Sequence, residues 1–188
     1  MTTYNCVENV AAWLKTRFES PDGAPLRLYE AQRQRAKDAP QIVKGQEPEA
    51  IYKGMEVHPF CLPSFLEAEK KAPYIIVQPT SGMDVQTPEQ PVKTTIGIRF
   101  VIAIYNPGDN EQEGARVLQE LIDFLRIELT RKVVIPDMKQ KAPSYVLDLA
   151  SGIYWEIYHE NTRPYSCGWM EMTFGLQSVV REDVQWLI

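Results

Sequence analysis

The feature that most constrains the fold of this chain is a regular alternation of apolar residues between Thr94 and Tyr105. Four isoleucines and a phenylalanine occupy every second position, at Ile96, Ile98, Phe100, Ile102 and Ile104. Because successive side chains of a strand point to opposite faces, this period of two predicts a long strand with one apolar face. The other elements of the fold are predicted around it.

A long helix is predicted directly after this strand. Asn106-Pro107-Gly108-Asp109 interrupts the alternation, and Asp109 with Gln112 has the spacing of a capping box. From Glu111 to Lys132 apolar residues recur at helical spacing over about half of the circumference. One stripe holds Gly114, Leu118, Leu121, Ile122, Leu125 and Leu129, and its neighbour holds Val117, Phe124 and Ile127. We therefore expect a largely buried helix.

Three further strands complete the predicted core. Tyr74 to Gln78 is a compact apolar run between two prolines and suits a short strand, whereas the polar stretch Thr80 to Lys93 is expected to be a long connection. Ile153 to His159 and Tyr165 to Val179 alternate again. The residues between them, 160–164, are too few for a helical crossover, so these strands should pair antiparallel.

The N-terminal part of the chain is less regular. Residues 1–20 are predicted to form a helix, because apolar residues recur at helical spacing from Cys6 to Phe18. Frequent prolines in residues 21–73 predict a partly extended arm. Within that arm, Tyr29 to Lys37 suits a short helix, and Leu62 to Lys70 suits another turn or two.

The element order predicts an α+β fold. Strand, strand, helix, strand, strand along residues 74–180 favours an antiparallel sheet of about four strands with one long helix packed on a face. The N-terminal helix and the proline-rich arm are added to this core, and residues 181–188 form a C-terminal tail. A length of 188 residues with 44% hydrophobic and 24% charged residues is typical of a single domain.

Charge and hydropathy exclude several classes of protein. The net charge of −5 argues against a free-standing DNA-binding module, which needs clustered cations. No apolar stretch reaches the roughly 18 to 20 residues that span a bilayer, and the N-terminus does not read as a signal peptide. The cysteines Cys6, Cys61 and Cys167 lie far apart and predict no disulfide framework. We expect a soluble protein.

The sequence contains no catalytic motif that convinces. There is no phosphate-binding loop, no nucleophile turn of the Gly-x-Ser-x-Gly type, no His-Glu-x-x-His and no Cys-x-x-Cys. His58 and Cys61 would need at least two more ligands to hold a metal, so we interpret them as structural. Glu156 and His159 fall on opposite faces of the predicted strand, and Cys167 is interpreted as a half-buried thiol.

Two further clusters have plain structural interpretations. An aromatic set is predicted to pack across neighbouring strands: Tyr154, Trp155, Tyr158, Tyr165 and Trp169. A basic set in the arm suits a solvated helix face or, alternatively, a contact with an acidic neighbouring subunit: Arg27, Arg33, Arg35 and Lys37.

Residues 72–180 resemble the tail terminator or tail completion proteins of long-tailed bacteriophages and prophages. The segments that carry the resemblance are APYIIVQP, TIGIRFVIAIYNPG, GARVLQELIDFLRIEL and IYWEIYHENTRPYSCGWMEMTFGL. The last of them contains a Trp-Glu-x-Tyr to Pro-Tyr-x-x-Gly-x-Met-x-x-x-Phe pattern. Its residues are Trp155, Glu156, Tyr158, Pro164, Tyr165, Gly168, Met170 and Phe174.

The resemblance implies a structural virion protein without catalytic activity, cofactor or bound metal. Such a protein assembles in the host cytoplasm as a ring, commonly a hexamer, on the head-proximal end of the tail tube, stops tube growth and joins the head or neck. Its partners would be other copies of itself, the tail tube protein and a connector or neck protein. DNA would pass through the lumen without sequence-specific binding, and the acidic excess would discourage phosphate contacts. No membrane is involved.

Under this interpretation, the connection Thr80 to Lys93 and the arm are interfacial segments. The candidate interface residues are Met83, Asp84, Val85, Gln86, Glu89, Arg27, Arg33, Arg35, Glu160 and Arg163.

Three alternatives stay open. A neck or head-completion protein, or the cap of a phage-tail-like bacteriocin, belongs to the same structural class. A small-molecule enzyme would use Glu156, His159 and Cys167. A cytosolic adaptor would bind peptides at an exposed sheet edge, for which Tyr74 to Gln78 is the candidate strand.

Overall fold

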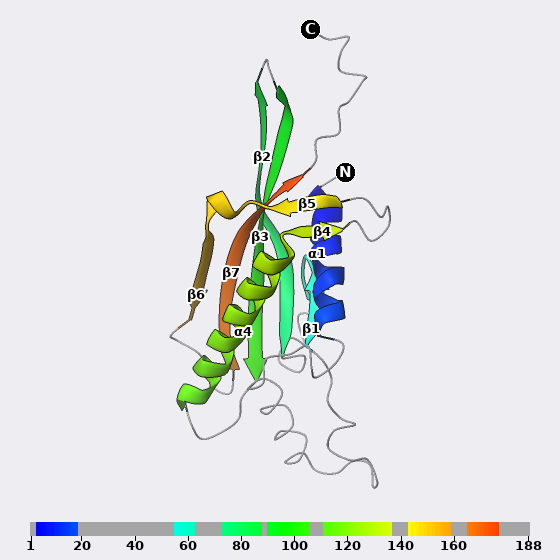
Figure 1. The fold of residues 1–188 in the computed structure, drawn as a ribbon. Coiled ribbons are helices and arrows are strands. Elements are labelled where there is room, and N and C mark those ends of the chain that lie inside the picture. Colours follow the sequence, from blue (N-terminus) through cyan, green and yellow to red (C-terminus); the bar gives the residue numbers. More distant parts are fainter. Residues whose placement is uncertain are drawn as a thin grey trace.

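The computed structural model describes residues 3–18, 55–62, 73–87, 90–105, 111–136, 143–158 and 165–176. Two helices, a short 3-10 turn and the strands of one sheet make up this part of the chain (Figure 1). In chain order they are α1 (Thr3–Arg17), β1 (Glu56–Pro59), β2 (Tyr74–Thr87), β3 (Gln90–Tyr105), α4 (Glu111–Lys132), β4 (Val134–Pro136), β5 (Pro143–Leu147), η4 (Leu149–Ser151), β6 (Ile153–Ile157) and β7 (Tyr165–Leu176).

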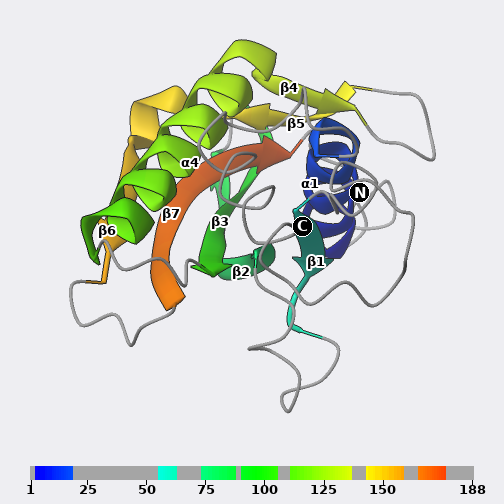
Figure 2. The same cartoon turned by 90° about the horizontal axis from the view of Figure 1, so that it is seen from below.

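The described strands form one seven-stranded sheet in the order β1-β2-β3-β7-β5-β4, with β6 also paired to β7. Among the described strands, only the β1–β2 pair is parallel. β6 and β5 follow one another along the same side of β7, because β6 pairs with its first half and β5 with its last residues. The sheet curls, and β5 and β4 fold over toward α1 (Figure 2).

The core lies on one face of this sheet. The predicted alternation of β3 is confirmed, since Ile98, Phe100 and Ile102 are fully buried. β7 alternates in register with it and places Met172 opposite Ile98 and Met170 opposite Phe100. Residues directly opposite each other on paired antiparallel strands have their side chains on the same side of the sheet, so β3 and β7 together form the sheet side of the core.

Both helices pack on that face. α1 lies over β1, β2 and β4, and α4 lies over β7, β3 and β6 (Figure 2). The predicted stripe of α4 is confirmed by Leu118, Leu121 and Leu125, which are completely buried, while Ile127 is 43% exposed and does not belong to the buried side. α1 covers the range expected for the N-terminal helix. None of the described helices has the length and apolarity that a membrane span requires.

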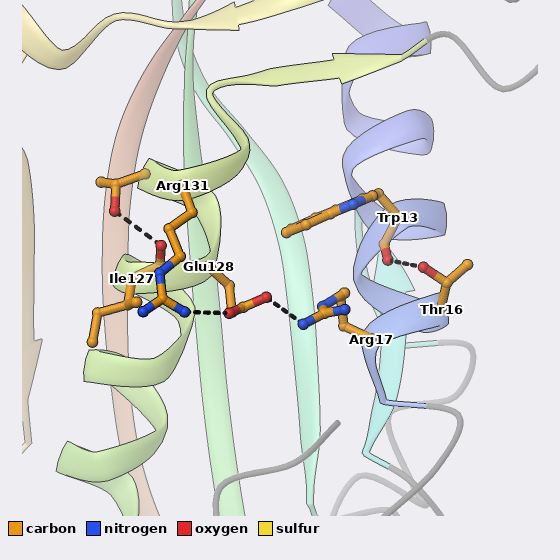
Figure 3. A network of polar contacts seen from close by, with 7 residues as sticks. Trp13, Thr16, Arg17, Ile127, Glu128 and Arg131 are labelled. Atoms are coloured by element: carbon orange, nitrogen blue, oxygen red, sulfur yellow. Dashed lines mark hydrogen bonds and ion pairs between the residues drawn. The ribbon is translucent and has the colours of Figure 1, made fainter. Parts of the chain in front are cut away.

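A carboxylate links the two helices. Glu128 of α4, only 15% exposed, pairs with Arg17 of α1 and with Arg131 one turn further along α4 (Figure 3). The Glu128 carboxylate accepts a hydrogen bond from Arg17 and forms an ion pair with Arg131, which together compensate for its removal from water. The network fixes how the C-terminal ends of both helices lie on the sheet.

The fold is α+β as predicted, but the described sheet has seven strands instead of about four. β1 lies inside the segment predicted as an extended arm, and β4 and β5 lie between the predicted helix and the last two strands. All three are short and contain or adjoin prolines, so they lack the long alternation that identifies a strand in a sequence. The antiparallel pairing of β6 with β7 is confirmed.

The prediction of a long connection at Thr80 to Lys93 is wrong. β2 continues to Thr87, β3 begins at Gln90, and the two strands pair along this length as one antiparallel hairpin. The predicted adaptor edge is also wrong, because Tyr74 to Val77 lies between β1 and β3. Arm residues 21–54 and 63–72, which hold the predicted helix at Tyr29 to Lys37 and all but the first residue of the one at Leu62 to Lys70, lie outside the described residues, as do the Asp109 cap and the tail 181–188.

Candidate subunit interface

The β2–β3 hairpin extends past the rest of the sheet. β1 accompanies β2 only from Tyr74 to Val77, and β7 accompanies β3 only from Thr94 onward. Beyond these points the hairpin has no described neighbour and stands clear of the helices (Figure 1). Its surface there carries apolar side chains, since Met83 is 60% and Val85 41% exposed. Apolar residues on a projecting two-stranded ribbon are typical of a contact with another molecule.

A β-bulge marks the place where the hairpin leaves the sheet. The register shifts between Pro79 and Ser81, opposite Gly97. A Cβ at Gly97 would lie 2.6 Å from Thr80 Oγ1 and 2.7 Å from Ser81 Oγ, so glycine makes room for both hydroxyls. Thr80 in turn donates to Glu171 Oε1 at 3.2 Å. Bulges increase local twist and re-aim the strands that follow them, so this contact sets the direction of the hairpin.

A polar network crosses the face of the sheet opposite the helices. Arg99 of β3 pairs with Glu171 of β7 at 2.8 Å and stacks on the ring of Trp169 at 4.6 Å. Trp169 Nε1 donates to Glu156 Oε2 of β6 at 3.1 Å. These contacts satisfy the charges within the sheet and lock β3, β7 and β6 together. These contacts between Arg99, Glu171, Trp169 and Glu156, the polar ladder, are structural and do not form a reactive site.

Exposed aromatic side chains gather on β6 and on Tyr158, the residue that follows it. Tyr154 is 64% exposed, and Trp155 and Tyr158 are each 45% exposed. The predicted cross-strand packing is therefore wrong for these three rings. The ring pairs recorded within the described ranges lie elsewhere, between Tyr4 and Phe60 and between Phe18 and Phe124. Trp169 of the predicted set is held by Arg99 and Glu156.

The titratable residues weighed as catalytic or metal-binding do not gather in the described part of the chain. No group of three or more His, Cys, Asp or Glu side chains suited to a metal ion occurs there. His58 contacts Glu56 at 3.1 Å, and Cys61 is exposed. Cys167 is half-buried as predicted, and burial raises the pKa of its thiol, which disfavours the nucleophilic thiolate.

One hollow in the described part of the chain adjoins His58 through Pro59, which is one of its lining residues. A shallow pocket of about 280 Å³ lies against α1 and β1 and is lined by Asn5, Glu8, Asn9, Ala11, Ala12, Lys15 and Pro59. β6, which carries Glu156, stands on the opposite side of the molecule in both views (Figures 1 and 2). The pocket therefore does not join Glu156 or Cys167 into an active site.

The structure locates only part of the predicted interface set. Met83, Asp84, Val85 and Gln86 follow one another on the projecting half of β2. Outside the described residues lie Glu89, Arg27, Arg33, Arg35, Glu160, Arg163 and His159. The exposed aromatic residues Tyr154, Trp155 and Tyr158 are not in the predicted interface set. Strand alternation alone does not reveal that these three side chains are exposed.

Comparisons with known proteins add no family assignment. No family model matches this chain, and no curated protein matches it in sequence.

Proposed function

We propose that this chain is a structural subunit of a phage tail, a tail terminator that forms a ring on the head-proximal end of the tail tube. The ring stops tube growth and offers a surface to the head or neck. The proposal rests on the resemblance of residues 72–180 to such proteins and includes no catalytic step.

The observation that carries it is the projecting β2–β3 hairpin. A two-stranded ribbon is marginally stable in water by itself, because neither face is packed. Here Val85, opposite Lys93, lies on the two-stranded part, and Met83, opposite Thr95, lies at its base where β7 still borders β3. Both side chains are exposed and lose favourable burial for as long as they face water. Contact with another subunit or with the tube would bury both side chains and support the ribbon on one face.

The body of the molecule supports the same function by its rigidity. α1, α4 and the sheet share one continuous apolar core, to which β1, β4 and β5 also contribute. A subunit whose work is done by interfaces needs such a scaffold, because the geometry of a closed ring depends on the angle between neighbouring copies. The polar ladder of Arg99, Glu171, Trp169 and Glu156 stiffens the face that carries β6.

The experiment uses the full chain together with the tail tube protein encoded in the same gene neighbourhood. Negative-stain microscopy of the purified protein should show rings, and tubes polymerised in its presence should be shorter and capped at one end. A double substitution, Met83→Ser with Val85→Ser, should leave a folded protein that neither forms rings nor limits tube length.

The control is Ile127→Ser, which changes an equally exposed apolar residue on α4. It should form rings and cap tubes as the unmodified protein does. Tubes of unchanged length together with a monomeric chain would refute the proposal. Rings that bind a head connector and ignore the tube would favour the neck protein instead.

A further inference from the structure

The edge of β6 is open in a way that the hydrogen-bond pattern defines. Tyr158 N–H donates to the Cys167 carbonyl of β7 at 3.0 Å. Because the backbone groups of successive strand residues point to alternate sides, Tyr154 and Glu156 also face β7, whereas Ile153, Trp155 and Ile157 direct their N–H and C=O groups away from it. No described strand lies on that side.

The other outer strands of the sheet are protected. On β1, Glu56 N–H and Phe60 N–H point to β2, so Pro59 faces outward and offers no N–H. β4 is only three residues long and ends in Pro136. β6 has neither proline nor lysine nor a bulge, and the carboxylate of Glu156, its one charged residue, is held by Trp169. Natural sheets use edge prolines, lysines, bulges and short strands to prevent unwanted pairing. Their absence on β6 indicates an edge that pairs with another strand.

A second open edge lies on the projecting half of β2. The Thr173 carbonyl accepts from Asp148 N–H, so the backbone groups of Thr173 point away from β3. The backbone groups of its neighbour Met172 therefore point toward β3 and its partner there, Ile98. It follows that the backbone N–H and C=O groups of Thr95 and Lys93 point to β2. Those of their partners Met83 and Val85 point back to β3. The N–H and C=O groups of Gly82 and Asp84 are therefore directed outward.

We propose that the two open edges pair between successive copies of this chain, the hairpin edge at Gly82 and Asp84 of one copy adding as a strand to the β6 edge of the next. This inference rests on the proposed ring and names the contact that closes it. The edges complement each other, because each presents outward groups at every second residue and each carries exposed apolar side chains, Met83 and Val85 on one and Tyr154 and Trp155 on the other.

The separation of the two edges selects a ring over a dimer. The hairpin projects from one end of the sheet, and β6 forms its lateral border (Figure 1). A contact between two different patches is head-to-tail and propagates until it closes, whereas β6 pairing with a second β6 would give an isolated two-fold dimer. The two arrangements therefore predict different oligomers from the same edge.

The test removes one outward N–H from each edge. Trp155→Pro and Asp84→Pro each delete an N–H that points away from the strand's own partner, so the β6–β7 and β2–β3 bonds remain. Trp155→Ala and Asp84→Ala are the matched controls, because they shorten the same side chains and keep the N–H. Circular dichroism and thermal unfolding establish that all four variants fold.

Analytical ultracentrifugation then separates the arrangements. Each proline variant alone should be monomeric, and an equimolar mixture of the two should form dimers and nothing larger, because one intact hairpin meets one intact β6 edge. Both alanine variants should retain rings. A dimer formed by Asp84→Pro alone would overturn the proposal in favour of β6–β6 pairing.

Hydrogen exchange on the unmodified protein provides a measurement without mutation. The amides of Trp155, Ile157 and Asp84 should exchange at least tenfold more slowly in the assembled ring than in a dilute monomer. If the unmodified protein forms rings while these amides stay unprotected or the proline variants still assemble, the edge pairing is wrong and the proposed ring function stands. If the unmodified protein forms no ring, the proposed function fails and the pairing with it.

Discussion

Gly168 of β7 gives the sharpest prediction for stability, because its lack of a side chain allows β6 and α4 to pack closely against it. A Cβ at this position would lie 2.7 Å from the backbone oxygen of Glu156, 3.3 Å from Leu118 Cδ2 and 3.4 Å from Ile157 Cα. A contact under 3 Å with backbone is relieved only when the strand moves. Gly168→Ala should therefore push β6 away from β7 and lift α4.

The expected magnitude combines two opposing effects. Overpacking a well-packed core costs about 1 to 3 kcal/mol. Replacing glycine by alanine also restricts the unfolded chain, which stabilises the fold by about 0.4 to 1 kcal/mol where the backbone accepts alanine. The net loss should be about 1 to 2 kcal/mol, which lowers the melting temperature by roughly 2 to 8 °C in a chain of this size.

Gly175 of the same strand is the matched control. The nearest atom to a Cβ there is the backbone oxygen of Val146 at 3.7 Å, an ordinary van der Waals distance. Gly175→Ala should leave the stability unchanged or raise it by up to about 1 kcal/mol. Both variants are compared by urea unfolding followed by tryptophan fluorescence. Equal stability of the two variants would show that the close contact at Gly168 has no energetic consequence.

Three other predictions concern the polar contacts and the buried thiol. Glu128→Gln should lower the free energy of unfolding by about 1 kcal/mol in dilute buffer and by less at high salt, because the charge that pairs with Arg17 is lost; no salt dependence of the difference would contradict this. Arg99→Lys should cost about 0.5 to 1 kcal/mol and change the emission of Trp169, since lysine lacks the planar group that stacks on the indole; an unchanged spectrum would count against the stack. Burial raises the pKa of the Cys6 thiol from 9.0 to about 12, so the unfolded thiol ionises first and stability should fall as the pH rises through this window. Cys6→Ala should flatten that fall in alkaline urea titrations, and an equally steep fall would point to other groups.

The sequence predicted the elements that are packed against one another. β3, β7 and α4 have one face in the core, so their apolar residues repeat with the period of the element, and the bounds of α4 agree with the predicted Glu111 to Lys132. The alternation of Met170, Met172 and Phe174 identified β7 for the same reason. An element shows a periodic pattern of apolar residues in the sequence only when one of its faces is buried.

The hairpin escaped prediction because that condition is missing. Beyond Pro79, β2 is paired to β3, and its side chains Ser81, Met83 and Val85 are exposed, with no core that would require apolar residues at every second position of β2. Polar residues, glycine and prolines are then tolerated, and the segment has the composition of a loop. The open edge of β6 was missed for a related reason, since the direction of backbone groups depends on pairing and leaves no trace in the side chains.

The most direct test of the account is the mass of the purified full-length protein in solution, measured by sedimentation over a wide range of concentration. A chain that works by pairing two different strand edges should form a single closed oligomer of defined size, and its dissociation should expose the amides of β6 and of the hairpin together. A protein that stays monomeric at every concentration, or that forms an open series of ever larger species, would contradict it.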